Sequence, residues 1–313
     1  MADMVMILAW VGAVVGPLIG WRVVRRWRSL GPAARTGSTF FAALYGLGVW
    51  AFLIEPETLS VRHVTVESAA WQGPPLRIGI LSDTHVGAPH VTPARVGKVV
   101  ARLSKEAPDI VVFLGDYVGG HAPAGERTPQ ARAEIAQGIA ALGGVRAPLG
   151  RIAVLGNHDW WYDGPAVEKL LSRSGLFPLE NQTVRITRPT GAFWVSGVAD
   201  AYSQRTRPSV EAALAGVASG EPVILLSHFP DIFETVPGRV ALTLAGHSHC
   251  GQVNLPFVGR PITPSPGSAR WPCGLYEVGG RQLYVTGGLG VSILPLRFRA
   301  PPEIVIVTLR ARP

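Results

Sequence analysis

Two apolar stretches near the start of the chain dominate its hydrophobic pattern. Residues 5–21 and 39–54 carry no charged side chain, and each is near the lower end of the roughly 17–25 residues that span a bilayer as a helix. The connection between them, residues 22–38, carries five arginines and no acidic residue. We therefore predict a transmembrane helical hairpin over residues 1–57.

The charge of the connection also predicts an orientation. The positive-inside rule puts a short arginine-rich loop in the cytoplasm, so both ends of the hairpin would lie outside. We expect a multi-pass protein of the inner (cytoplasmic) membrane with an extracytoplasmic C-terminal domain. Two alternatives stay open. A signal peptide could precede a buried helix, although Asp3 and the absence of a basic start argue against it. One segment could instead lie flat in the interface, which would place the domain inside.

Beyond residue 75 the pattern alternates between short apolar runs and amphipathic stretches. Buried strands are predicted over 76–81, 109–114, 151–155, 223–226 and 242–245, and helices over 93–105, 130–142, 166–174 and 208–218. Further strands are expected over 275–278, 283–286 and 303–309. This alternation predicts an α/β domain over residues 76–313. Residues 58–75 are predicted to be a connector with a candidate strand at 61–66.

Side chains of metal-ligand type follow five of the predicted strands. In open α/β sheets ligands bind beyond the carboxyl ends of strands, so these side chains can converge on one site. Alone, each would be a strand-end cap or a satisfied core histidine. Five of the chain's eight histidines lie in these pieces, however, which random placement would rarely produce. The candidate ligands are Asp83, His85, Asp116, Asn157, His228, His247 and His249.

The donor types predict which ions could bind. Carboxylate, imidazole and amide oxygen without sulfur suit Mn, Fe, Zn or Mg ions. Seven ligands are too many for one tetrahedral ion, and they suit two divalent ions that share a carboxylate. Two ions about 3.5–4 Å apart can clamp the attacking and leaving oxygens of a phosphoryl displacement.

Composition narrows the remaining classes. The chain is 47% hydrophobic, which is high for a soluble enzyme, and its net charge is +8. Nucleic-acid binding is not favoured, because no basic run is interleaved with aromatic residues. Cys250 and Cys273 are the only cysteines, which excludes a disulfide scaffold or a cysteine-rich zinc site. Cys250 could approach a metal, pair with Cys273 in an oxidising compartment, or stay reduced.

The order of the polar pieces resembles a known superfamily. Asp-x-His, Gly-Asp, Gly-Asn-His-Asp, His and Gly-His-x-His, over about residues 76–249, are similar to the calcineurin-like metallophosphoesterases. Residues 287–303 resemble its membrane-associated bacterial branch, which includes predicted phosphodiesterases and enzymes that split UDP-2,3-diacylglucosamine. Ser248 and Cys250 depart from the Thr and Gly usual there, and neither change removes a ligand. The resemblance implies a four-layer αββα sandwich.

The resemblance also implies how the site residues divide. Asp83, His85 and His249 would hold one ion, and Asn157, His228 and His247 the other. Asp116 would bridge the two. His158 would protonate the leaving alkoxide or stabilise the charged phosphate. Asp159 would orient the His158 imidazole.

Several residues outside the motifs carry weaker expectations. His90 and His121 are expected on the surface near the site. Residues 160–162, Trp-Trp-Tyr, are expected to pack in the core or at the rim, with an apolar substrate groove as the alternative. Arg297 and Arg299 could bind a phosphate or carboxylate, or form a solvated basic face.

These expectations combine into a membrane-anchored metallophosphoesterase that hydrolyses phosphodiester or pyrophosphate bonds, with amphipathic or lipid-linked substrates among the candidates. A UDP-linked substrate made in the cytoplasm conflicts with an outward-facing site. The alternatives are a membrane-bound nuclease, suggested by the positive charge, and a non-catalytic metal-binding scaffold. The oligomeric state stays open.

Overall fold

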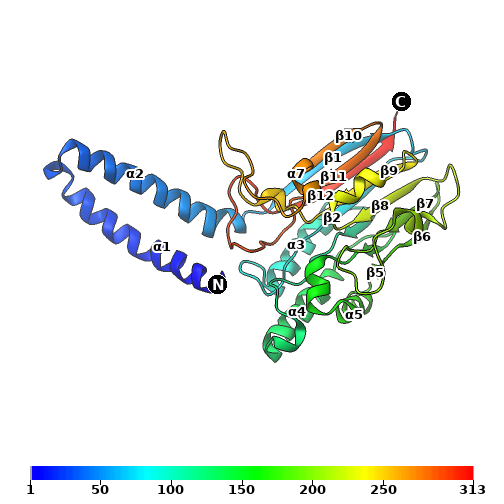
Figure 1. Cartoon of the computed structure of the whole chain (residues 1–313), viewed down its shortest axis with the longest axis horizontal. Helices are drawn as coiled ribbons and strands as arrows, with labels where there is room; N and C mark the ends of the chain where they lie inside the picture. Colours follow the sequence, from blue (N-terminus) through cyan, green and yellow to red (C-terminus); the bar gives the residue numbers. More distant parts are fainter. Residues whose placement is uncertain (1, 313) are drawn as a thin grey trace.

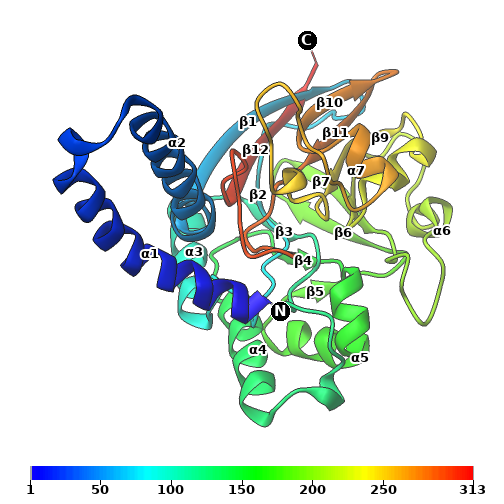
Figure 2. The same ribbon diagram turned by 60° about the vertical axis from the view of Figure 1, so that its left-hand side comes forward.

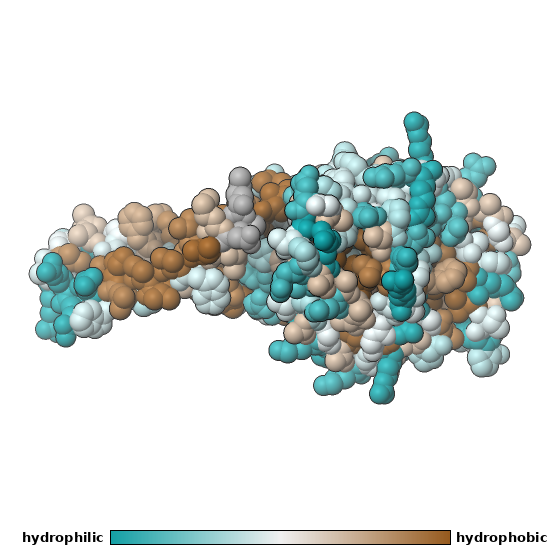
Figure 3. Space-filling view, turned by 90° about the horizontal axis from the view of Figure 1, so that it is seen from below, coloured by the Kyte–Doolittle hydropathy of each residue, from teal (hydrophilic) through white to brown (hydrophobic). Residues whose placement is uncertain are grey.

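A helical hairpin projects from a single α/β domain in the computed structural model, which describes residues 2–312 (Figure 1). Helices α1 (Ala2–Arg25) and α2 (Pro32–Val49) contain the two predicted apolar stretches, and α2 continues through a π-helical turn (Trp50–Ile54) and a 3-10 turn (Glu55–Glu57). Hydrophobic residues cover the hairpin and hydrophilic ones its far tip (Figure 3). Both helices are long and apolar enough to cross a membrane and are almost wholly unburied.

Two six-stranded sheets form the centre of the domain. The first has the order β1 (Ser60–Ser68), β12 (Glu303–Ala311), β2 (Leu76–Leu81), β3 (Ile110–Phe113), β4 (Arg151–Ala153), β5 (Phe177–Pro178). The second has the order β10 (Gly274–Val278), β11 (Arg281–Val285), β9 (Val240–Ala245), β8 (Val223–Ser227), β7 (Gly191–Gly197), β6 (Gln182–Arg188). Strands β2 to β5 of the first sheet run parallel, and so do β7, β8, β9 and β11 of the second. Within each sheet the carboxyl ends of these strands therefore lie at the same edge.

Alternating side chains build the layers. On β2 and β3, Ile78, Ile80, Ile110 and Val112 pack between the sheets, while Leu81, Val111 and Phe113 face the helices. Helices α3 (Pro93–Lys105), α4 (Pro129–Leu142) and α5 (Asn157–Arg173) cover the first sheet, and the short α6 (Val210–Leu214) and α7 (Pro266–Arg270) lie against the second (Figure 2). The predicted αββα sandwich with a helical hairpin is confirmed, although its second helical layer is thin.

Three elements differ from the expectation. β1 confirms the candidate strand at 61–66 within the expected connector but is longer, and it pairs in parallel with β12 at the edge of the first sheet. α5 begins at Asn157 rather than at residue 166, because Gly164-Pro165 produces a kink at Asp163 and does not mark the start of the helix. The helix expected over 208–218 is confined to the five residues of α6.

Candidate metal centre

The candidate ligands sit where strands end, on strained backbone. Asp83 and His85 follow β2, Asp116 follows β3, and His247 and His249 follow β9. All five have a positive φ, between 48° and 64°, a region that residues other than glycine rarely adopt. Such outliers concentrate at functional sites, where the surrounding structure holds them in place. The turns therefore serve to aim these side chains into one space.

Two glycines allow this close packing. A Cβ at Gly246 would lie 2.2 Å from the Ser82 hydroxyl and 2.7 Å from an Asp83 carboxylate oxygen. A Cβ at Gly156 would lie 2.3 Å from Asp116 Oδ1. Contacts this short exclude any side chain at these two positions. Glycine is therefore needed before Asn157 and before His247, so that the backbone can approach the carboxylates of Asp116 and Asp83.

Asp116 occupies the centre of the cluster. Its Oδ2 lies 3.3 Å from His228 Nε2, 3.6 Å from His85 Nε2 and 3.9 Å from His158 Nε2. Its Oδ1 accepts a hydrogen bond from the His158 backbone N–H at 2.9 Å. Burial would raise the pKa of Asp116, but the charges of His228 and His158 hold it well below its usual range. This carboxylate is therefore an anion that several imidazoles face.

The other donors fall into two groups around Asp116. On one side, His249 Nε2 lies 3.1 Å from His85 Nε2 and 3.6 Å from Asp83 Oδ1. On the other, His228 Nε2 lies 3.2 Å from both Asn157 Oδ1 and His247 Nδ1. All seven predicted ligands are thus brought together, each buried.

The protonation of the imidazoles suits metal binding. Burial lowers the pKa of His85 to about 3, and burial beside His228 lowers that of His247 to about 3, so both rings are neutral near pH 7. His228 donates from Nδ1 to the Leu114 carbonyl at 2.7 Å, which leaves Nε2 to face the cluster. His247 Nε2 is buried without a protein partner. Burial would lower the pKa of His228 as well, but the Asp116 carboxylate raises it to about 10, so a metal ion would have to displace the Nε2 proton of His228. Imidazoles, carboxylates and an amide oxygen in two adjoining groups are a donor set suited to a binuclear metal site.

Comparison with known proteins agrees with this geometry. Residues 76–251 match the family model described as calcineurin-like phosphoesterase. The chain belongs to this family. It is 31% identical to the uncharacterized metallophosphoesterase YkuE of Bacillus subtilis, over 84% of this chain and 89% of that protein. It is 28% identical to the phosphodiesterase YaeI of Escherichia coli, over 75% and 82% of the two chains. It is 27% identical to the UDP-2,3-diacylglucosamine pyrophosphatase LpxG of Chlamydia trachomatis, over 86% and 95%.

His158 stands at the edge of the metal centre of this phosphoesterase. Its Nδ1 donates to the Gly120 carbonyl at 2.9 Å, and its Nε2 lies 3.5 Å from the Ser292 hydroxyl. The ring packs against His121 and Trp161, with centroids 5.0 and 4.7 Å away. The Gly120 bond fixes the ring and leaves Nε2 facing Asp116 Oδ2 and the Ser292 hydroxyl.

Asp159 has a different role from the one expected. Its two carboxylate oxygens accept hydrogen bonds at 2.8–3.1 Å from four backbone N–H groups, those of Asp116, Tyr117, Val118 and Gly156. It therefore anchors the turn after β3 to the start of α5. The carbonyl of Gly120 holds the His158 ring instead.

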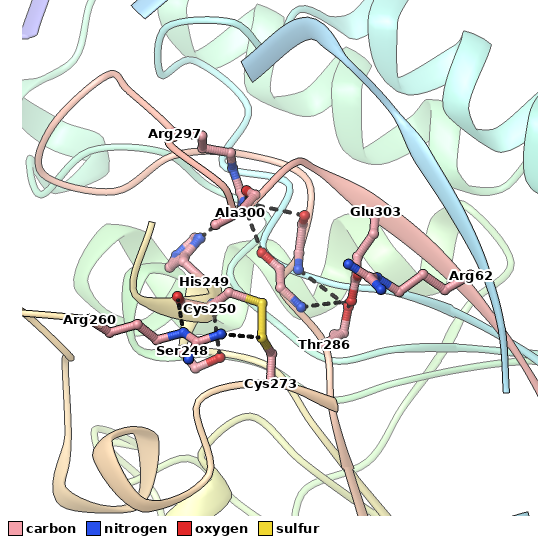
Figure 4. Close-up of a disulfide and its surroundings, with 12 residues drawn as sticks. Arg62, Ser248, His249, Cys250, Arg260, Cys273, Thr286, Arg297, Ala300 and Glu303 are labelled. Atoms are coloured by element: carbon pink, nitrogen blue, oxygen red, sulfur yellow. Dashed lines mark hydrogen bonds and ion pairs between the residues drawn. A yellow bond between two sulfur atoms is a disulfide. The ribbon is translucent and has the colours of Figure 1, made fainter. Parts of the chain in front are cut away.

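Two cysteines and an arginine brace the end of the His-x-His motif. Cys250 and Cys273 form a disulfide, so the pairing alternative is the one observed (Figure 4). Arg297 is fully buried and donates to the carbonyls of Gly287, Gly290 and Ala300 (Figure 4). It is neither a solvated basic residue nor open to a phosphate, and burial lowers its pKa to about 10. Its role is to hold residues 287–300 against the site.

His90 also differs from its expectation as a surface residue. Its side chain is 5% exposed and lies between Glu57, 3.2 Å away, and the Pro295 carbonyl, 3.1 Å away. It therefore joins the end of the hairpin to the segment before β12. His121 is exposed as expected, and Trp160 and Tyr162 are buried in the core.

A cavity of about 500 Å³ opens over the metal centre. Asp116, Asn157, His158, His247 and His249 form its floor. Its walls include Ser292, Ile293 and Leu294 from the stretch 287–303 that resembles the membrane-associated branch. They also include four residues that no motif marks: Tyr202, Phe229, Gln252 and Ile262. Trp161 lines it too, which favours the groove alternative for that one residue. The cavity walls are therefore mostly apolar around a polar floor.

Proposed function

We propose that the chain is a membrane-anchored phosphoesterase that uses two divalent metal ions to hydrolyse phosphodiester or pyrophosphate bonds. The observation that carries the proposal is the position of Asp116, whose Oδ2 lies between two groups of ligand atoms. A carboxylate shared in this way suits a pair of ions better than one. Asp83, His85 and His249 would hold the first ion, Asn157, His228 and His247 the second.

The bound ions would supply Lewis acidity and a water of lowered pKa beside the phosphorus. His158 acts from the cavity side. With Nδ1 held by the Gly120 carbonyl, its Nε2 can present a proton to the leaving oxygen or a positive charge to the phosphate. The His121 and Trp161 rings restrict its rotation.

The cavity supports a substrate with an apolar part. A monophosphate would need only the polar floor, whereas apolar walls can bury the second substituent of a diester or pyrophosphate. The similarity to proteins named phosphodiesterase and UDP-2,3-diacylglucosamine pyrophosphatase supports the same bond classes.

Two independent features support an outward-facing domain in the inner membrane. The hairpin loop carries the arginines that favour the cytoplasm, and the domain carries a disulfide that an oxidising compartment preserves. A UDP-linked substrate made in the cytoplasm would not reach a site in this place, so the natural substrate would be one exposed at the outer face.

The test is hydrolysis by the full chain in detergent, with bis(p-nitrophenyl) phosphate, p-nitrophenyl phosphate, added Mn²⁺ and a chelator. We expect Mn²⁺-dependent cleavage of the diester that the chelator stops. Asp116→Ala and Asn157→Ala should lose activity and bound metal, and His63→Ala, an exposed histidine on β1, should lose neither. Wild-type rates in both ligand variants, or activity that survives chelation, would reject the proposal.

A further inference from the structure

Two loops beside the cavity expose large apolar side chains next to the hairpin. They are the post-β9 loop, residues 251–265, and the pre-β12 loop, residues 287–302. Figure 1 shows both, in gold and brown-red, on the side of the domain where α2 ends. We define the apolar rim as their six exposed large apolar side chains: Leu255, Phe257, Val258, Ile262, Ile293 and Leu294.

The backbone of both loops is built to hold the rim outward. Leu255 and Gly259 exchange backbone hydrogen bonds at 2.7 and 2.9 Å, which makes a tight turn with Phe257 and Val258 at its tip. Phe257 has φ 65° and Ile293 φ 61°. β-branched and bulky residues rarely adopt a positive φ. Both side chains are exposed, so packing in a core does not explain their conformation. Such strained and exposed apolar residues indicate a surface with a partner.

Hydrogen bonds fix the rim at the level where the hairpin meets the domain. The Arg297 backbone N–H donates to the Ala51 carbonyl at 2.9 Å, and that of Ala300 to Glu55 Oε1 at 2.6 Å. The two loops pair through Phe298 and Gln252. Trp50 is half exposed and begins the π-helical turn that contains Ala51. Tryptophan is enriched at membrane interfaces. A hairpin that leaves the bilayer near Trp50 therefore brings the rim to the bilayer surface.

The charge of the loops fits the same partner. Residues 251–265 and 287–302 contain no acidic residue, and two of their three arginines reach the surface, half-buried Arg260 and exposed Arg299, while Arg297 is buried. An apolar surface with basic neighbours is the combination that binds anionic lipid interfaces. Ile262, Ile293 and Leu294 belong both to the rim and to the cavity wall. An apolar path thus runs from the rim to the metal centre.

We infer that the apolar rim inserts into the outer surface of the bilayer that the hairpin crosses, and that an amphipathic phosphoester enters the cavity sideways from the lipid, with its chains along the rim. This inference rests on the proposed function. It names the substrate class as a membrane lipid or lipid-linked phosphoester whose phosphate lies at the headgroup level.

Insertion is tested with the full chain in vesicles of phosphatidylethanolamine and phosphatidylglycerol. Phe257→Cys is labelled with an environment-sensitive fluorophore, and Phe177→Cys on β5, also an exposed phenylalanine, is the matched control. Because the native cysteines form a disulfide, only the new thiol reacts. We expect a blue shift and quenching by spin-labelled lipid at residue 257 and neither at residue 177. Equal behaviour of the two labels on vesicle-bound protein overturns the inference.

Substrate entry is tested with p-nitrophenyl hexadecyl phosphate in the vesicles and p-nitrophenyl methyl phosphate in solution. Phe257→Asp and Val258→Asp lie outside the cavity, so cleavage of the methyl ester should stay unchanged. Cleavage of the hexadecyl ester should fall by about tenfold, the scale of losing one buried aromatic side chain. Equal rates of hexadecyl ester cleavage in variants and wild type overturn lateral entry. Failure of the wild type to cleave the methyl ester with metal, or to float with vesicles, is the separate failure of the proposed function.

Discussion

Among single residues, His158 is the one whose substitution best distinguishes a loss of catalysis from a loss of bound metal. Its ring packs edge-on against the His85 ring, with centroids 4.5 Å apart, but the hydrogen bond that ties it to Asp116 comes from its backbone N–H, which an alanine keeps. Its loss should therefore leave the ligand cluster intact. The cluster itself depends on backbone strain at five ligands, which a substitution at a ligand would release.

We expect His158→Ala to keep its metal and to lower kcat for the diester by about 10²–10⁴-fold, the usual loss when a positioned proton donor is removed. Metal content by mass spectrometry and steady-state kinetics measure the two effects on one preparation. His63→Ala provides the control on β1. Loss of both ions in His158→Ala would make the residue a ligand and refute its role as a proton donor.

Asp159 tests the backbone anchor that the structure assigns to it. The Asp159 carboxylate accepts four backbone hydrogen bonds, two at each oxygen, whereas an asparagine has only one acceptor oxygen. In Asp159→Asn two backbone N–H groups would therefore face an amide NH₂ group. We expect the free energy of unfolding to fall by about 2–4 kcal/mol. Asp163→Asn, which changes an exposed helix-capping carboxylate of the same helix, should cost about 1 kcal/mol or less. Chemical denaturation of both variants distinguishes the anchor from a merely local cap.

Among elements, the segment from β9 to β10 depends on its cross-link. The disulfide joins residues 23 apart in the sequence, and Cys250 directly follows His249, so the cross-link restrains the loop that carries four of the six residues of the apolar rim. We expect the double variant Cys250→Ser, Cys273→Ser to lose about 3 kcal/mol of stability. Thermal unfolding with and without reductant measures it: reductant should lower the wild-type midpoint and leave the variant unchanged. A reductant effect of the same size in both would show that the cross-link does not restrain this segment.

The elements that sequence pattern predicted best are those with one clear period. β2 and α3 have the predicted bounds, since a buried apolar run and a proline-led amphipathic helix leave little choice. β1 was underestimated because an edge strand mixes exposed and buried positions. All seven candidate ligands lie together in the structure, as the convergence of strand ends in parallel sheets predicts. The roles of Asp159, His90 and Arg297 were not predicted, because each acts through carbonyls or backbone N–H groups that sequence alone does not place.

At the scale of the whole molecule, the hairpin, the rim and the cavity form one arrangement. The rim adjoins the end of α2, and the cavity lies between the rim and the metal centre. Under the proposed insertion, the hairpin would fix the height of the metal centre above the bilayer as well as keep the enzyme at the membrane. A soluble phosphoester needs no such fixed height, whereas a lipid phosphate is held at one level.

The proposed outward-facing location of the domain can be tested with fusions to the C-terminus. We expect alkaline phosphatase, which matures only in an oxidising compartment, to be active after residue 313, and green fluorescent protein to stay dark there. Replacing the five arginines of residues 22–35 by serine removes the charge bias and should reduce the outward signal. Bright fluorescence with inactive phosphatase would put the domain in the cytoplasm. The disulfide would then no longer indicate an oxidising compartment, and the hairpin would either cross with its arginine loop outside or lie in the interface.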